Sequence, residues 1–157
     1  MINIYRYGGV GAVEREGKKL PVQIPPRIAL KEIGAFIDVI ITHPRITHDS
    51  FIKKSKIVPK IMVKALVDTG ASSTVITPRV ADQLGLVHTG FQKVSSVQDE
   101  QERPVYYGFI IFPWGSGKEI PIVSCPLKNL DCLIGRDILM HWYFNYNGPD
   151  GSIVICD

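Results

Sequence analysis

The sequence predicts a mainly β fold with one or two short helices, and three observations support that class. Short segments rich in β-branched and aromatic residues recur along the chain. The 14 Gly and 11 Pro residues favour many turns over long helices. Helical spacing is confined to two brief stretches, residues 78–85 and 137–142. A length of 157 residues suits a single domain, so we expect one β-rich core.

The predicted strands are bounded by glycine, proline or clusters of polar residues. In chain order they span residues 35–41, 60–67, 90–96, 104–112, 120–125 and 152–156. The polar segment 97–103 joins two of them, which predicts a protruding β-hairpin. Residues 42–59 are polar and rich in turn formers, so a loop is expected there.

The clearest helix signal follows the apolar residues 75–76. Thr77 is a suitable N-cap, Pro78 fits the first helical position, and Gly85 can end the helix. Before residue 30 the pattern is different, because short apolar segments alternate with glycines and prolines that argue against a helix. We therefore expect an N-terminal extended arm or leader over residues 1–30 and one folded domain over residues 31–157.

Composition argues against several classes of partner. A net charge of +3 is too weak to indicate nucleic-acid binding, and the cluster Lys53, Lys54 and Lys56 falls in the expected loop. No apolar run approaches the roughly 18 residues that a membrane span needs. The first nine residues lack the pattern of a signal peptide. We expect a cytoplasmic protein that binds neither nucleic acid nor a membrane.

The metal-binding residue types show no useful spacing. Cys125, Cys132 and Cys156 cannot all pair within one chain, and neither they nor the four histidines are spaced as metal ligands. Free thiols and the absence of a metal site are the expectation. A thiol-dependent regulator is a weak alternative that these cysteines leave open.

The segment most suggestive of chemistry is residues 65–76. Asp68 directly follows an apolar strand, and Thr69 and Gly70 come next. Glycine lets the backbone turn sharply, which would point the carboxylate out of the end of the sheet. Alone the motif is weak, because Asp68 could equally be a structural turn residue.

A second motif lies downstream, where two apolar residues precede Gly135, Arg136 and Asp137. Together the two motifs resemble the retropepsin family, the single-domain aspartic proteases typified by retroviral proteases. The resemblance covers about residues 34–156. It implies a closed, barrel-like β half with a flap hairpin and an active site completed by a homodimer.

The resemblance assigns roles to the residues of the first motif. Asp68 would be catalytic, and the second carboxylate would be Asp68 of another copy. Thr69 would hydrogen-bond across the dimer, and Gly70 would offer its N–H to the carboxylates. Ala71 and Ser72 would complete the active-site loop, Ser72 standing where retroviral proteases commonly carry an acidic partner for the arginine. No cofactor is implied.

Other roles follow from the same resemblance. The hairpin from about residue 90 to 112 would be the flap, with the residues Ser96, Val97, Gln98 and Asp99 toward its tip. Leu130 and Leu133 would line substrate pockets. Gly135, Arg136 and Asp137 would form a structural motif, and the final strand would help to build an inter-subunit sheet.

The expected function is therefore an aspartic endopeptidase that hydrolyses extended polypeptides. Water would be activated between two carboxylates that share one proton. Ala71 stands where pepsin-like enzymes carry a serine hydroxyl that stabilises the ionised carboxylate, so the pair should hold its proton to higher pH, which predicts activity at mildly acidic pH. The alternative is a dimeric peptide-binding module of the same fold that does not cut. Loss of cleavage in Asp68→Asn would separate the two.

Overall fold

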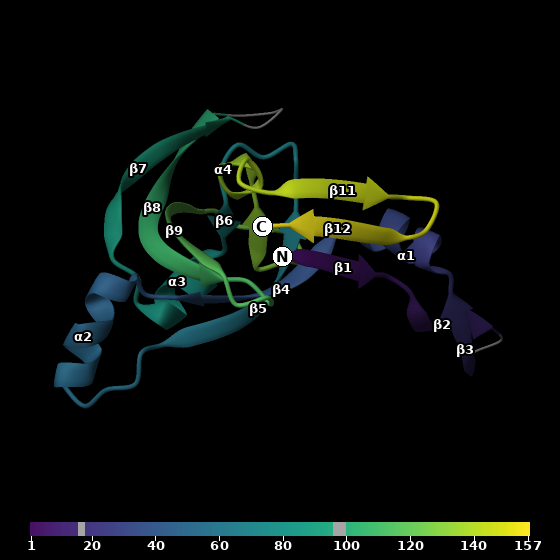
Figure 1. Cartoon of the computed structure of the whole chain (residues 1–157), viewed down its shortest axis with the longest axis horizontal. Helices are drawn as coiled ribbons and strands as arrows, with labels where there is room; N and C mark the ends of the chain where they lie inside the picture. Colours follow the sequence, from purple (N-terminus) through teal and green to yellow (C-terminus); the bar gives the residue numbers. More distant parts are fainter. Residues whose placement is uncertain (16–17, 96–99) are drawn as a thin grey trace. The chain divides into compact units, whose positions relative to one another are not determined.

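The computed structural model describes residues 1–15, 18–95 and 100–157 (Figure 1). Within those ranges it contains twelve strands and four short helices, so the mainly β class is confirmed and the number of helices exceeds the one or two predicted. The chain divides into two compact units, Met1–Phe36 with Leu139–Asp157 and Ile37–Ile138. The domain boundary expected at residue 30 stays a prediction.

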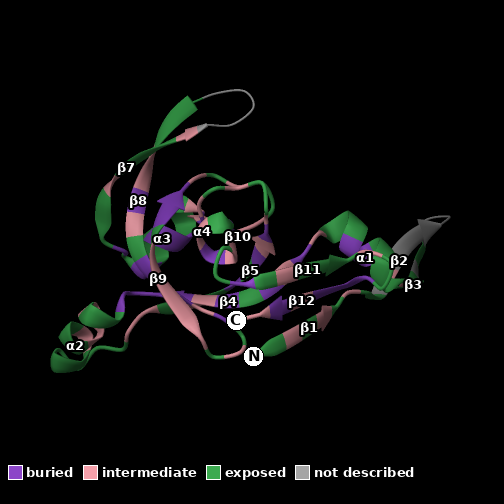
Figure 2. Cartoon of the chain, turned by 45° about the horizontal axis from the view of Figure 1, so that its top comes forward, coloured by how far each residue is buried: buried purple, intermediate pink, exposed green. Residues whose placement is uncertain are grey.

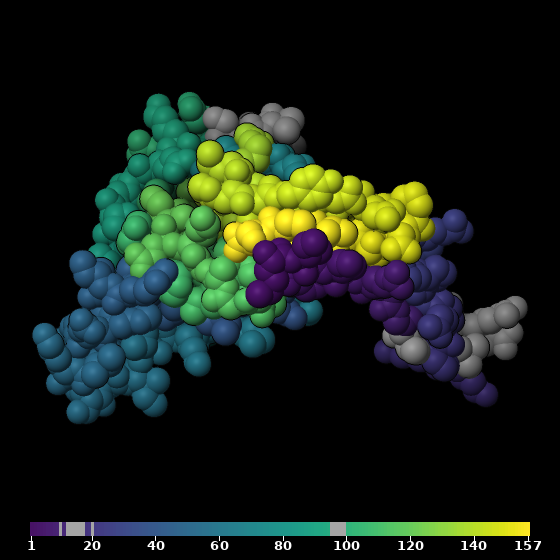
Figure 3. All heavy atoms as spheres, viewed as in Figure 1, coloured from purple at the N-terminus to yellow at the C-terminus, as the bar shows by residue number. Residues whose placement is uncertain are grey.

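The first unit is built on a small antiparallel sheet and a hairpin. Its elements are β1 (Ile2–Arg6), β2 (Gly9–Arg15), β3 (Lys18–Ile24), α1 (Pro26–Ile33), β11 (Tyr143–Asn147) and β12 (Ser152–Cys156). The terminal strand β12, yellow in Figure 3, lies between β1 and β11. Both edges of β12 are thus paired within the chain, and a role of this sheet between subunits stays a prediction.

Helix α1 shows that the prediction of no helix around the prolines was wrong. Pro26 occupies the first turn, where its missing N–H would have no intrahelical partner, and the ring fixes a helical φ. The carbonyl of Pro25 accepts hydrogen bonds from the N–H groups of Ile28 and Ala29, both at 3.0 Å. The buried side chains Ala29 and Leu30 then anchor the helix in the first unit.

The second unit contains the closed sheet. Its elements are β4 (Phe36–Thr42), α2 (Arg45–Lys53), β5 (Lys60–Val67), β6 (Val75–Ile76), α3 (Pro78–Leu84), β7 (His88–Ser95), β8 (Glu100–Ile111), β9 (Gly117–Ser124), β10 (Cys132–Ile134) and α4 (Arg136–Leu139). Neighbouring strands pair in the order β4-β5-β10-β6-β9-β8-β7, and β4 also pairs with β8. The second pairing closes six of the described strands into a ring, which confirms the barrel-like architecture. Ile41, Ile110, Ile122 and Ile134 are fully buried in its core.

The predicted hairpin is present as the long, curved antiparallel pair β7–β8 (Figure 1). The pairing runs from His88 opposite Tyr106 to Ser95 opposite Glu100, with a shift in register between His88 and Gly90. The expected tip residues Ser96, Val97, Gln98 and Asp99 lie outside the described residues. A flap function for this hairpin stays a prediction.

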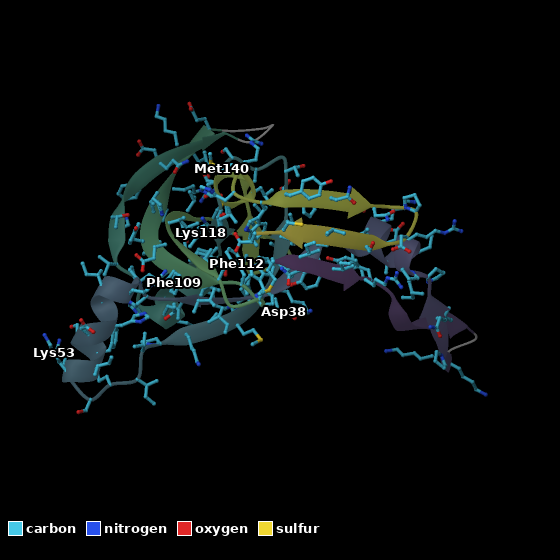
Figure 4. The ribbon with its side chains drawn as sticks, in the orientation of Figure 1. Asp38, Lys53, Phe109, Phe112, Lys118 and Met140 are labelled. Carbon is cyan, nitrogen blue, oxygen red and sulfur yellow. The ribbon has the colours of Figure 1, made fainter. Side chains whose placement is uncertain are left out.

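Helix α2 lies where a loop was predicted, and that prediction was wrong. The helix has no buried residue (Figure 2) and no side-chain N-cap, so neither a buried face nor a cap anchors it. Tertiary contacts hold it. The Arg45 guanidinium lies 4.6 Å from the centre of the Phe109 ring, which Figure 4 labels, and Arg45 Nε lies 3.4 Å from Glu119 Oε1.

Helix α3 is confirmed almost as predicted. It begins at Pro78, buries Val80, Ala81 and Leu84, and ends at Gly85 in a left-handed conformation with φ of 61°. Thr77 occupies the N-cap position but makes no capping hydrogen bond. Its hydroxyl instead donates to Asp131 Oδ1 at 3.3 Å.

Candidate active site

The loop that carries Asp68 joins β5 to β6, although these two strands are not neighbours in the sheet. Strand β10 lies between them, parallel to β5 and antiparallel to β6. The N–H of Asp68 continues the β5–β10 pairing by donating to the carbonyl of Ile134 at 3.0 Å. The sheet therefore fixes where the loop begins.

The Asp68 carboxylate is oriented by its own loop. Oδ1 accepts a hydrogen bond from the N–H of Gly70 at 2.8 Å. A Cβ atom on Gly70 would lie 3.1 Å from the same oxygen, which is closer than most such contacts. Glycine at this position thus allows the N–H to approach the carboxylate. This is the Asp68–Gly70 contact that the motif led us to expect.

Arg136 fixes the back of the loop through backbone carbonyls. Its Nη1 donates to the carbonyl of Thr69 at 2.8 Å and to that of Gly70 at 3.0 Å. Its own N–H donates to the carbonyl of Ala71 at 2.9 Å. Three successive carbonyls therefore bond to one residue. These bonds hold the arginine against the loop through backbone groups alone.

Thr74 is a structural residue of the site that the sequence analysis missed. It is fully buried. Its hydroxyl donates to Asp137 Oδ1 at 2.7 Å and accepts from the Gly135 N–H at 3.1 Å, while its N–H donates to Asp137 Oδ2 at 2.8 Å. The available signal was weak, because Thr74 follows two serines and differs from them only in standing directly before the apolar residues 75–76. Asp137 also accepts from the N–H of Ile138, so it has a structural role.

Gly135 lets the two motifs approach each other. A Cβ atom built there would lie 2.5 Å from both the carbonyl carbon and the oxygen of Ser73. Backbone atoms cannot give way as a flexible side chain can, so only glycine fits at this crossing. The second motif is therefore the support on which the Asp68 loop rests.

The two predicted pocket residues lie elsewhere on the second unit. Leu133 is in β10, opposite Leu66 on one side and Val75 on the other. Leu130 lines a cavity of about 460 Å³ together with Arg79 and Asp131. The hydrogen bond and charge of Arg79, whose Nη2 lies 2.6 Å from Asp131 Oδ2, lower the pKa of that carboxyl. Substrate contact by either leucine stays a prediction.

A second cavity adjoins the Asp68 loop. Residues 70–73 and residues 92–94 of β7 line it, and its volume is about 310 Å³. Thr69, Gly70 and Ser72 are exposed, so this edge of the loop is open to a ligand or to another chain. In the described ranges no three His, Cys, Asp or Glu side chains gather to hold a metal ion. No helix in the same ranges is long and apolar enough to cross a membrane.

A closed β sheet that presents an aspartate on a loop, braced by a Gly-Arg-Asp segment, defines the retropepsin-like class of aspartic protease folds. A family model described as "gag-polyprotein putative aspartyl protease" matches residues 57–141, which is more than half of the chain. The chain belongs to this family, and the resemblance stated from the two motifs is confirmed.

Solved structures of three proteins are similar at low identity. EIAV protease in complex with the inhibitor HBY-793 matches 51% of this chain and 76% of its own, at 20% identity and a TM-score of 0.43. A retropepsin-like aspartic protease from Rickettsia conorii matches 77% of this chain and 91% of its own, at 20% identity and a TM-score of 0.46. The retroviral protease-like domain of Ddi1 from Leishmania major matches 72% of this chain and 82% of its own, at 16% identity and a TM-score of 0.42. No curated protein matches the chain.

Proposed function

We propose that this protein is an aspartic endopeptidase whose active site is formed by two copies of the chain. The observation that carries the proposal is the geometry of the Asp68 loop. Its carboxylate is oriented by Gly70, and the loop behind it is held by Arg136 and by the Thr74–Asp137 contacts. Such rigidity is what a catalytic group needs to act without reorganisation.

Two copies are required because the sequence contains a single Asp-Thr-Gly motif. A symmetric dimer would bring the same loop to both sides of one axis. The exposed loop residues Thr69 and Gly70 support this, since they offer an uncovered edge beside Asp68. Two carboxylates placed together repel when both are charged, so the pair would hold one proton.

The reaction then needs no group beyond the two carboxylates and water. The ionised Asp68 takes a proton from water as the oxygen attacks the peptide carbonyl carbon. The protonated Asp68 gives its proton to the carbonyl oxygen, which forms a tetrahedral diol. One Asp68 then gives a proton to the amide nitrogen while the other takes a proton from a diol hydroxyl, so the C–N bond breaks and an amine and a carboxylic acid are released. One proton held between two carboxylates thus supplies both acid and base.

An extended polypeptide is the substrate that the fold favours. Strand β7 is at one end of the sheet order, and β8 is its partner within the described residues. Its other edge can pair with a peptide in β conformation. Because β7 also lines the cavity beside residues 70–73, a peptide bound along it would pass close to the catalytic loop.

Asp68→Asn tests the proposal because it keeps the side-chain shape but removes the base. Cleavage of a fluorogenic peptide library should fall by about 10²–10⁴-fold, the usual contribution of general acid–base catalysis. Asp82→Asn, an exposed change on α3, should cut like the natural protein. Circular dichroism of both variants would check folding.

Three outcomes would contradict the proposal. Undiminished cleavage by Asp68→Asn would exclude the mechanism. Peptide binding without cleavage by the natural protein would point to the binding module. A rate that stays flat or rises down to about pH 3 would contradict a shared proton, because protonation of both carboxylates removes the base.

A further inference from the structure

The cavity beside the Asp68 loop has a polar wall made by side chains from two elements. Gln92 Nε2 on β7 donates to Ser73 Oγ at 3.1 Å, which joins the hairpin to the loop. A serine hydroxyl that accepts one hydrogen bond can still donate its own hydrogen, and the glutamine amide still has a carbonyl oxygen. The exposed Ser72 is a further polar member of this wall. The wall therefore offers both donors and acceptors.

Another part of the cavity lining is apolar. Val75 of β6 and Val123 of β9 stand opposite each other in the parallel pair of these strands. Val94 of β7 lines the same cavity, and Val123 is almost fully buried. Three β-branched side chains thus form a surface that suits the methylene groups of a bound side chain, not its polar end.

Charge in this cavity is low. None of the described residues that line it is acidic, and Lys93 is its one charged member. Lys93 lies directly opposite Glu102 in the β7–β8 register, so a carboxylate faces the lysine from the neighbouring strand. Its neighbours Gln92 and Val94 belong to the other face of β7, because side chains alternate along a strand. A carboxylate bound in the cavity would therefore meet no arginine among the described lining residues that could bond to both of its oxygens.

We propose that this cavity is a substrate subsite that selects a side chain ending in an uncharged amide, glutamine before asparagine. The inference rests on the proposed endopeptidase function and names the class of substrate that it would take. An amide both donates and accepts, which matches the wall of Ser73 and Gln92, and the two methylenes of glutamine reach the valines. A volume of about 310 Å³ has room for such a side chain.

The alternatives each fit less well for a stated reason. Leucine has a similar shape, but it would cover the solvent-exposed polar groups of Ser73 and Gln92 without replacing the water that they lose, which disfavours its binding. Glutamate would lose the hydration of its charge without gaining an ion pair. Lysine would bring a charge into a cavity whose described lining residues include no acidic side chain. The expected order is therefore glutamine, then asparagine, with leucine, glutamate and lysine clearly lower.

Matched peptides test this order. At each position around the scissile bond, kcat/KM is measured for peptides that differ only in Gln, Asn, Leu, Glu or Lys. One position should prefer Gln over Leu by about tenfold, which corresponds to one hydrogen bond that leucine cannot make. Ser73→Ala combined with Gln92→Leu should bring the two peptides to near equality. The same chemical changes outside the cavity, Ser50→Ala with Gln83→Leu, should leave the preference unchanged.

The outcomes separate this inference from the proposed function. Cleavage with no preference for an amide at any position, or a preference that survives the double variant in the cavity, overturns the subsite. If no peptide is cut, the endopeptidase proposal fails, and calorimetric binding of the same peptides to Asp68→Asn decides the subsite alone. Tighter binding of the Gln peptide, lost on changing Ser73 and Gln92, supports it; equal or absent binding overturns it.

Discussion

Thr74 and Asp137 show how single residues make the site rigid. Thr74 is fully buried. Its N–H and its hydroxyl both bond to the second motif, through Asp137 and the N–H of Gly135. A buried polar group without a partner is costly, so such a network favours one arrangement of the loop strongly. Asp137 lies in the first turn of α4, and its carboxylate accepts hydrogen bonds both from Ile138 of that helix and from Thr74.

Cys132 gives a prediction about pH at the same scale. The residue lies in β10 and is fully buried, and burial raises the pKa of its thiol to about 12. The unfolded thiol ionises near pH 8.5, so above that pH the folded chain retains a proton that the unfolded chain has lost. Stability should therefore be complete below about pH 8.5 and fall by up to about 1.4 kcal/mol per pH unit above it.

The measurement is the free energy of unfolding in urea at several alkaline pH values. Cys132→Ala lowers stability at neutral pH because it leaves a cavity, but the part of the pH slope due to the thiol should vanish. Comparison of the two slopes removes the contribution of tyrosines and lysines. An identical slope in both proteins would show that Cys132 ionises equally in the folded and unfolded states.

At the scale of elements, the three-residue strand β10 has the largest effect on the site. It separates β5 from β6, so the Asp68 loop has to span a strand that comes more than 60 residues later in the chain. Gly135, at the end of β10, lies against the backbone of Ser73. The distance between β10 and the loop is therefore set by the lack of a side chain at one position.

Gly135→Ala tests that contact. The added methyl would meet backbone atoms of Ser73 at 2.5 Å, so the Asp68 loop has to shift. We expect a loss of about 1–3 kcal/mol in the free energy of unfolding, as for other overpacked sites, together with reduced peptide cleavage. Gly148→Ala is the matched control, since its nearest contact is a Tyr146 carbon at an ordinary 3.7 Å. Equal stability of the two variants in urea would show that the crossing has room for a methyl group.

The elements that could be predicted from sequence are those whose signals are local. Helix α3 has a proline at its start, a glycine at its end and buried residues at helical spacing, and all three are visible in the sequence. Helix α2 depends on Arg45 reaching Phe109 and Glu119, which are more than 60 residues away. The same distinction applies to the site. Asp68 and Gly70 are recognisable as a motif, whereas Gln92 becomes part of the site only through the pairing of β7.

At the scale of the whole molecule, the proposed function requires two chains to complete one active site. One chain supplies one Asp68, and the proposed chemistry needs two carboxylates that share a proton. Two such chains would have to meet at the exposed edge formed by Thr69 and Gly70. Activity should therefore depend on the concentration of chains as well as on their sequence.

Mixing natural protein with Asp68→Asn tests the shared site. If subunits exchange at random in an equal mixture, about a quarter of the dimers contain two intact copies. The rate per natural chain should then be about half of that without the variant. A rate that is unaffected by the variant, after enough time for exchange, would mean that each chain acts alone. Asp82→Asn in the same mixture is the control, because it leaves Asp68 in every subunit.

Because β10 lies between β5 and β6, the Asp68 loop cannot reach its final form as soon as it is synthesised. A ribosome has delivered residue 68 long before it delivers residues 132–138, and a loop cannot rest on a support that has not yet emerged. A nascent chain therefore carries its acidic motif without this support while more than 60 further residues are added. The Asp68 loop can take its braced form only after β10 and Arg136 have been made, so this part of the fold forms through contacts between distant segments.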